Sequence, residues 1–146
     1  MGKAVRAIII KDNQLLLIER EKDNSKYYTL VGGKVLDGET DEEALTRKVR
    51  EETGLIIHFS KLTFIEQHPE PYNQQYIYLC ETNNSQQVAL NKNSEEAYLN
   101  RFGANIHLPV WVSRSSLSSL PFRTPQLKEG IINGLKHGFP TTPKIL

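Results

Sequence analysis

The sequence predicts an α/β fold in which strands outnumber helices, and two observations support this prediction. Short runs of aliphatic, β-branched and aromatic residues recur along the chain, separated by residues that favour turns. Two longer segments begin with residues that cap helices and stop at a glycine. Because a sheet and an amphipathic helix must each bury an apolar face, we expect the helices to be layered on the sheet as a sandwich.

The strands are expected where the apolar runs stand between turn residues. Val5–Ile10 and Leu15–Glu19 flank a four-residue polar stretch, which is typical of a β-hairpin. Tyr27–Val31 is rich in aromatic and β-branched residues and stops at a pair of glycines. The other predicted strands are Leu55–Phe59, Lys61–Glu66, Gln75–Cys80 and Pro109–Val112.

The first helix is predicted from its two ends. Thr40 is a good N-cap, and Glu43 lies three residues later, as a capping box requires. We expect the helix to run to about Glu52 and to end at Gly54, because glycine readily adopts the left-handed conformation that closes a helix.

The second half of the chain is predicted to be less regular. Thr82–Asn105 is polar and is expected to form a long excursion, and loops of this length in compact domains tend to be functional or disordered. Ser113–Leu120 suggests a turn or a short helix. Thr124 can cap a last helix that has proline at its first position, runs to about Lys136 and stops at Gly138.

Composition limits the possible partners and compartments. The 146 residues are expected to form one domain, 1–146, and the formal net charge of +1 provides no basic surface for a nucleic acid polymer or an anionic membrane. The single cysteine, Cys80, excludes an intrachain disulfide and is expected to be a buried thiol. The chain shows neither a membrane-spanning apolar stretch nor a secretory signal, so we expect a cytoplasmic protein. A homodimer remains an open alternative.

The segment 32–55 carries the clearest chemistry. A glycine turn leads into an acidic helix that ends with two adjacent carboxylates, Glu51 and Glu52. Magnesium prefers oxygen ligands and is usually held by one or two carboxylates plus substrate phosphates. Residues four apart share a helix face, which places Arg47 beside Glu51 and Lys48 beside Glu52. Taken alone, such charges on a helix would be weak, solvated ion pairs. A P-loop is excluded, because the glycine pair lacks the required upstream glycine and following Ser or Thr.

This segment resembles the signature of the Nudix hydrolase superfamily, G-x5-E-x7-R-E-U-x-E-E-x-G-U, in which U is aliphatic. The flanking pattern of hairpin, strand, glycine pair and helix also agrees with that family. So does the late strand followed by a helix. The matching residues, in register, are Gly33, Glu39, Arg47, Val49, Glu51, Glu52, Gly54 and Leu55.

The resemblance implies a Nudix-type α/β/α sandwich with a mixed sheet and a MutT-like hydrolase. The implied activity is hydrolysis of the pyrophosphate bond in a nucleoside diphosphate linked to another moiety, with Mg²⁺ or Mn²⁺ as cofactor. Glu51 and Glu52 would be metal ligands, with the Gly33 carbonyl as a further ligand. Arg47 would orient a carboxylate, and Glu39 would support the loop or a second ion. The candidate substrate contacts are Lys48, Gly32 and Tyr28.

One departure from the signature affects the catalytic assignment. The residue after Arg47 is usually glutamate, a metal ligand or general base in many family members, and here it is Lys48. A protonated lysine cannot ligate a metal, and its charge repels a divalent cation. The general base is therefore left unassigned, with Glu95, Glu96, Glu70 and also His68 as candidates. A smaller departure is Val31, which stands where proline often precedes the glycine pair.

Two further functions stay open at this level. Lys48 favours a catalytically impaired Nudix-fold domain that binds or senses a nucleotide, and a structural partner-binding module is the third possibility. Tyr27, Tyr28, Tyr72 and Phe102 could stack on a base, although aromatic residues near strands more often pack in the core. No role is assigned to the remaining histidines, which are His58, His107 and His137.

Overall fold

The structure is a computed structural model that describes residues 2–68, 74–84, 87–91, 94, 96–97, 100 and 105–146. Within this part of the chain, seven strands form one mixed sheet with the order β6-β2-β3-β1-β5-β4-β7. β1 pairs with β5 in parallel and with β3 antiparallel, so the central strand joins the two halves of the sheet. The strands are β1 (Lys3–Lys11), β2 (Gln14–Lys22), β3 (Ser25–Lys34), β4 (Ile57–Glu66), β5 (Gln74–Thr82), β6 (Asn105–Ser113) and β7 (Lys144–Ile145).

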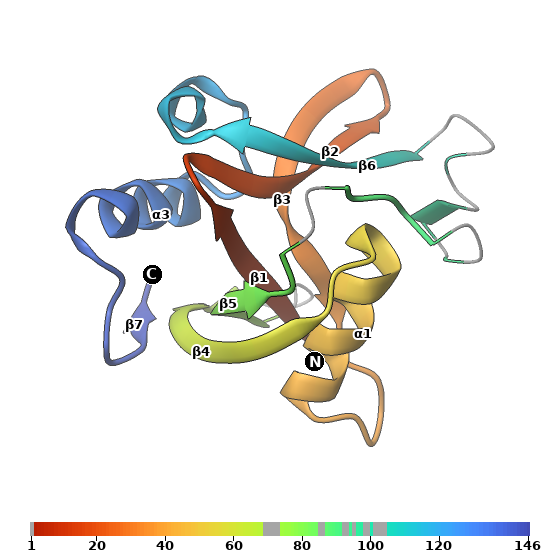
Figure 1. Cartoon of the computed structure of the whole chain (residues 1–146), viewed down its shortest axis with the longest axis horizontal. Coiled ribbons are helices and arrows are strands. Elements are labelled where there is room, and N and C mark those ends of the chain that lie inside the picture. Colours follow the sequence, from red (N-terminus) through yellow and green to blue (C-terminus); the bar gives the residue numbers. More distant parts are fainter. Residues whose placement is uncertain are drawn as a thin grey trace.

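Two helices cover the sheet from opposite sides. Figure 1 shows α1 (Asp41–Thr53) on one side of β1 and β5 and α3 (Pro125–His137) on the other, with the short 3-10 helix η1 (Arg114–Ser119) beside α3. Each helix has its own layer of buried side chains. This arrangement confirms the predicted α/β/α sandwich with a mixed sheet.

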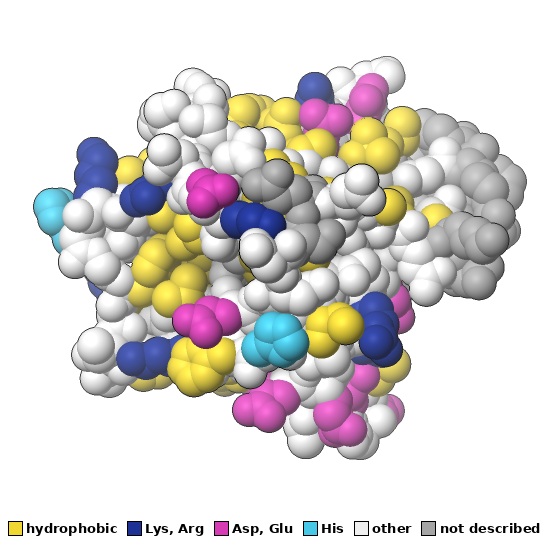
Figure 2. All heavy atoms as spheres, viewed as in Figure 1, with side chains coloured by type: hydrophobic (Ala, Val, Ile, Leu, Met, Phe, Trp, Pro, Cys, Tyr) yellow, Lys and Arg dark blue, Asp and Glu magenta, His cyan; other side chains and the backbone are white. Residues whose placement is uncertain are grey.

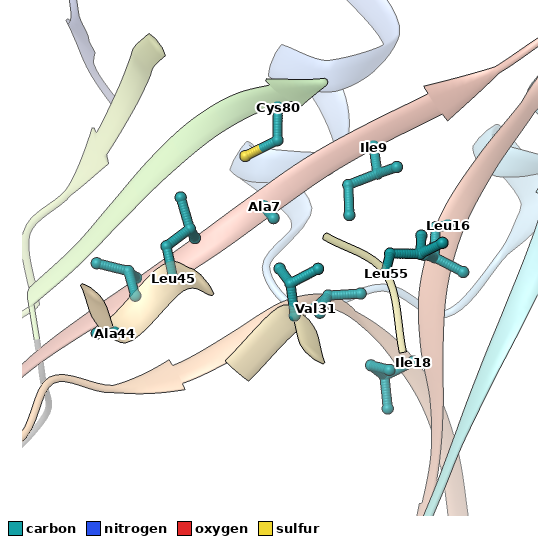
Figure 3. Packing of buried hydrophobic residues seen from close by; sticks show 11 residues of the cluster. Ala7, Ile9, Leu16, Ile18, Val31, Ala44, Leu45, Leu55 and Cys80 are labelled. Atoms are coloured by element: carbon teal, nitrogen blue, oxygen red, sulfur yellow. The ribbon is translucent and has the colours of Figure 1, made fainter. Parts of the chain in front are cut away.

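The alternation of side chains along β1 builds both layers. Val5, Ala7 and Ile9 point into the cluster under α1, while Ile8 packs in the cluster under α3, because successive strand residues face opposite sides of a sheet. Figure 3 shows Leu45 of α1 and the buried thiol of Cys80 around the α1-side cluster. Burial raises the pKa of Cys80 to about 12, as expected for an inert structural thiol.

The predicted caps of α1 are confirmed. The Thr40 hydroxyl accepts a hydrogen bond from the Glu43 amide at 3.1 Å, and the Glu43 carboxylate accepts one from the Thr40 amide at 3.0 Å. At the other end, Gly54 adopts φ 80° and its amide donates to the Arg50 carbonyl at 2.9 Å. These caps determine where α1 starts and stops relative to the glycine turn at the end of β3.

The sequence prediction was wrong at one strand break and incomplete elsewhere. Residues 55–59 and 61–66 were expected to form two strands, but β4 is continuous from Ile57 to Glu66. Two register shifts against β5 interrupt the alternation that a regular strand would show, which explains the apparent break. β6 is longer than the predicted Pro109–Val112, and β7 was not predicted. None of the helices in the described part of the chain has the length and apolar character that a bilayer crossing needs.

Candidate functional site

The glycine turn at the end of β3 contacts the second carboxylate of the acidic pair. The Gly32 amide donates a 2.7 Å hydrogen bond to Oε1 of Glu52, whose side chain is buried. Gly32 has φ 150°, and a Cβ built there would lie 2.0 Å from the Val5 carbonyl oxygen on β1. Only glycine therefore allows β3 to pass this close to β1 while presenting its amide to the helix. As predicted, α1 turns Glu52 toward the glycine turn.

Burial strongly perturbs Glu52. Burial raises its pKa to about 7, although the nearby Lys48 and Arg6 charges and the Gly32 amide act in the opposite direction. A carboxylate whose pKa lies near neutrality in a partly dry site is a common feature of functional sites. Its adjacent partner Glu51 is half-buried and lies 3.5 Å from Nη1 of Arg47.

Arg47 ties the loop before α1 to the helix. Its Nε donates to Oε2 of Glu39 at 2.8 Å and its Nη2 donates to Oε1 at 3.0 Å, which makes a two-pronged contact. The same Nη2 also donates to the Lys34 carbonyl at 3.0 Å. The Arg47 hydrogen bonds, followed by the Leu36 amide, lower the pKa of Glu39 to about 2. Glu39 thus stays charged and holds residues 34–39 against α1.

Lys48 lies at the centre of the acidic residues. Its Nζ is 2.8 Å from Oε2 of Glu96 and 3.5 Å from Oε2 of Glu51, and the residue is only 7% exposed. Burial alone would lower the pKa of Lys48, but the charges of Glu52, Glu96 and Glu51 outweigh it and raise the pKa above its usual value. Gly33 provides room for the lysine methylenes, since a Cβ at position 33 would lie 2.6 Å from Cε of Lys48.

The polar excursion brings Glu96 to this site by docking on the end of α1. The Ala89 amide donates to the Thr53 carbonyl at 3.1 Å, and the Asn91 amide donates to the Glu51 carbonyl at 2.7 Å. These bonds satisfy carbonyl groups that the last turn of a helix leaves without intrahelical partners. Of the predicted base candidates, the structure brings Glu96 to the acidic pair, whereas Glu95 and Glu70 lie outside the described residues.

A cavity of about 440 Å³ opens on the sheet face that α3 covers. Arg6 connects the two sites: it pairs with Gly32 across β1 and β3, and its charge acts on Glu52. The cavity walls combine three arginines with an aromatic ring. The lining residues include Arg6, Arg20, Arg123, Tyr27, His68 and Gln75.

The arginines of this cavity are organised by polar and aromatic contacts. Arg6 Nε donates to Gln75 at 3.0 Å, and Arg20 Nη2 donates to Asn105 at 2.7 Å. The Arg123 guanidinium lies 3.8 Å from the centre of the Tyr27 ring, a cation–π distance. Among the described residues, Arg20 Nε and His68 Nε2 are buried without a hydrogen-bond partner. These two atoms are available to a ligand.

Sequence reasoning missed these arginines because they come from segments far apart in the chain. The one local indication was Arg6, a charged residue inside the apolar run of β1. His107 was also assigned no role, yet it is buried, and burial followed by the Arg20 charge lowers its pKa to about 4. Tyr28 is not brought to the acidic cluster, since its hydroxyl donates to Glu19 at 2.9 Å. Tyr72 and Phe102 lie outside the described residues.

A divalent cation such as Mg²⁺ needs oxygen donors, which carboxylate side chains can supply. The described residues contain no group of three or more His, Cys, Asp or Glu side chains arranged to hold a metal ion. Glu51 and Glu52 nevertheless fit a single hard cation, because magnesium needs only one or two carboxylates when substrate phosphates and water complete its shell. Glu39 fits less well, since both of its oxygens already accept hydrogen bonds from Arg47.

The comparison with protein families agrees with this geometry. The model of the NUDIX domain matches residues 1–130. The chain belongs to the Nudix family. The Nudix match covers the glycine turn, α1 and most of the sheet, and ends within α3.

Similar proteins in this family carry names of nucleotide hydrolases. An ADP-ribose pyrophosphatase of Methanocaldococcus jannaschii is 46% identical over 68 residues, which are 46% of this chain and 40% of that protein. A putative 8-oxo-dGTP diphosphatase of Bacillus subtilis is 30% identical over 82 residues, covering 56% of this chain and 54% of that protein. The chain thus spans about half or less of these relatives. The solution structure of the Escherichia coli ORF135 protein matches 97% of this Nudix chain and 95% of its own, with a TM-score of 0.68 and 21% identity, which supports the fold.

Proposed function

We propose that this chain is a pyrophosphohydrolase that cleaves a nucleoside diphosphate linked to another moiety, with Mg²⁺ or Mn²⁺ as cofactor. The observation that carries the proposal is the contact between the Gly32 amide and the buried Glu52, next to Glu51. The names of the two relatives, a pyrophosphatase and a diphosphatase of nucleotides, support the substrate class. The arginine-lined cavity, whose Arg6 pairs with Gly32 across the sheet, suits an anionic substrate.

The residues proposed to hold the cation are Glu51 and Glu52, with the Gly33 carbonyl as a further ligand. When bound there, a divalent cation polarises a phosphoryl oxygen and lowers the pKa of a water molecule. Arg47 positions Glu51 and, through Glu39, the loop that precedes α1. We therefore assign Glu39 to loop support, the first of its two predicted roles.

The cavity arginines are proposed to bind the phosphates and the attached moiety. A guanidinium presents several donors in a plane and suits phosphate oxygens, and three guanidinium groups line this cavity. Arg20 Nε and, in the matching tautomer, His68 Nε2 would donate to the substrate, because neither has a hydrogen-bond partner in the described part of the chain.

Glu96 is the general base that the geometry favours. Its Oε2 is bound by Lys48, while its buried Oε1 has no hydrogen-bond partner among the residues described. Burial raises the pKa of Glu96, but the hydrogen bond and charge of Lys48 lower it overall, so the carboxylate is ionised and able to accept a proton. Lys48 would then position the base, and the Gly32 amide would position the carboxylate of Glu52, a proposed metal ligand.

A panel of nucleoside diphosphate derivatives tests the proposal. We expect magnesium-dependent release of two phosphorylated products from at least one of them. Glu52→Gln should abolish this turnover while keeping the fold, since the amide oxygen of glutamine can still accept from Gly32. Glu42→Gln, an exposed change on the same helix, is the matched control and should leave turnover unchanged. Full activity in Glu52→Gln would contradict the ligand assignment.

The second candidate function is a domain that binds or senses a nucleotide without turning it over. Lys48 favours it, because a lysine replaces the glutamate expected at this position. It predicts no product from any substrate, together with a higher melting temperature when nucleotide is added. Absence of both effects would favour a structural partner-binding module.

The remaining predictions concern cellular context. We propose a cytoplasmic location and a nucleotide derivative, not a nucleic acid polymer, as partner, consistent with the net charge of +1. Size-exclusion chromatography with light scattering decides between a monomer and the homodimer left open by the sequence.

A further inference from the structure

We propose that the Lys48 ammonium is a built-in counter-ion that takes the place of one divalent cation at the carboxylate cluster, which we define as Glu51, Glu52 and Glu96. The wild-type chain would then bind one metal ion fewer than a variant without this positive charge. The inference rests on the proposed function insofar as a cation is expected at Glu51 and Glu52.

The Lys48 ammonium group lies among the acidic side chains of the cluster. Lys48 Nζ lies 2.8 Å from Glu96 and 3.5 Å from Glu51, and the nearby Glu52 charge also acts on it. Carboxylates from α1 and from the excursion that follows β5 thus converge on one cation. A hard metal ion requires oxygen ligands, but the described acidic side chains are not arranged as a set of three around a metal, and an ammonium group pairs with Glu96 and Glu51 instead.

The shape of the glycine turn accommodates the Lys48 side chain. The lysine side chain lies in a space that a glycine leaves open, since a Cβ at position 33 would come within 2.6 Å of Cε and 3.1 Å of Cδ. Lys48 is 7% exposed, so its methylenes are packed and its charge is withdrawn from water. A surface lysine paired by chance would be neither packed nor buried to this degree.

Lys48 also balances the negative charge of the cluster. Without Lys48, three carboxylates would share this region with Arg47, which is 3.5 Å from Glu51, and with Arg6, whose charge acts on Glu52. Like charges repel strongly where water is largely excluded, so the cluster needs a further positive charge to stay closed. Lys48 supplies that charge whether or not a metal is present, and its contact with Glu96 keeps the excursion attached to α1.

One buried oxygen of the cluster lacks a hydrogen-bond partner in the part of the chain that the structure describes. Glu96 is 8% exposed, and within the described residues its buried Oε1 has no hydrogen-bond partner. Buried carboxylate oxygens are normally paired, so this oxygen is available to water or to a cation. Once the ammonium is removed, both oxygens of Glu96 become available, and the cluster gains the ligand that an additional metal ion needs.

Counting manganese ions by electron paramagnetic resonance tests this directly, with no need for substrate. Lys48→Glu should bind one more Mn²⁺ per chain than wild type, or bind Mn²⁺ on the order of tenfold more tightly. Lys48→Met retains the length of the side chain without its charge and should change Mn²⁺ binding in the same direction. Lys61→Met, an exposed lysine on β4, is the control and should match wild type. Equal ion counts and affinities in wild type and both Lys48 variants would overturn the inference.

Thermal unfolding in a chelator keeps the inference testable if Lys48→Glu does not fold. In EDTA, wild type should lose only the stabilisation supplied by the one cation proposed at Glu51 and Glu52, a smaller shift than in Lys48→Met. Lys48→Met should melt roughly 5 °C or more lower in EDTA and recover with Mn²⁺, because a metal then replaces the missing charge. A Lys48→Met protein that melts like wild type under both conditions would refute the counter-ion role. Failure of the proposed hydrolysis appears separately, as absence of product in the substrate panel.

Discussion

The two glycines of the turn are expected to respond very differently to the same substitution. Alanine at position 32 would place its Cβ 2.0 Å from the Val5 carbonyl oxygen and 2.8 Å from the Arg6 Cα, both on the central strand β1. For alanine at position 33, the three atoms nearest to the Cβ all belong to the Lys48 side chain, and the first of them is Cε at 2.6 Å. Backbone in the middle of a sheet cannot move aside, whereas the end of a lysine can.

The size of each effect follows from these contacts. For Gly32→Ala, overpacking against β1 combines with a φ of 150° that side-chain-bearing residues rarely adopt. Together these should lower the free energy of unfolding by about 4 kcal/mol, a large part of the stability of a typical domain. For Gly33→Ala, the lysine can shift, and we expect a loss of only about 1 kcal/mol. Displacement of the Lys48 ammonium group should then weaken its contact with Glu96.

Urea unfolding, followed by the fluorescence of the single tryptophan, Trp111, measures both values. The reasoning is refuted if the free energy of unfolding of Gly32→Ala lies within about 1 kcal/mol of the wild-type value, since the cost of the backbone contact with β1 would then have been overestimated. It is also refuted if Gly33→Ala costs as much as Gly32→Ala, because the lysine would then be as rigid as the strand.

Three other changes test separate parts of the structure. Thr40→Ala removes the capping box with Glu43 and should cost about 1 kcal/mol in urea unfolding, and an unchanged midpoint would contradict the cap assignment. Arg47→Lys removes the two-pronged contact, so the Glu39 pKa, now about 2, should rise toward its ordinary value in a carbon-13 NMR titration. In wild type this depressed pKa contributes stability that is present above about pH 4.5 and is lost as pH falls through about 2. Folding lowers the pKa of His107 from 6.5 to about 4. Between these pH values the unfolded chain binds more protons than the folded protein, so the free energy of unfolding should fall as pH drops from 6.5 to 4. His107→Gln should lose less stability over that interval, and identical pH profiles of the two proteins would contradict this.

Local sequence rules predicted the elements that depend on neighbouring residues. The caps of α1 at Thr40 and Gly54 involve hydrogen bonds over three or four residues, so the sequence contains the whole interaction. The same holds for Thr124 and Pro125 at the start of α3. The strand break predicted near residue 60 was wrong, because bulges against β5 depend on a partner strand that is not adjacent in the chain.

The composition of the candidate site was predicted only in part. The contact between Glu52 and the glycine turn follows from the spacing of the motif, which positions a helix residue against the strand that precedes the helix. The pairing of Lys48 with Glu96 spans 48 residues and depends on where the excursion docks. The cavity arginines belong to β1, β2 and the segment before α3, and no periodicity connects them.

The sequence by itself determined which family signature the chain carries, where its helices begin and end, and which carboxylates stand next to each other on α1. Only the tertiary structure decided what neutralises those carboxylates and what surrounds them. The physical reason is that hydrogen bonds and side-chain periodicity within an element act over a few residues, whereas burial and charge act through space. In the motif, Lys48 appears to be an unfavourable neighbour of a metal site. In the structure, it is the cation that three acidic side chains share.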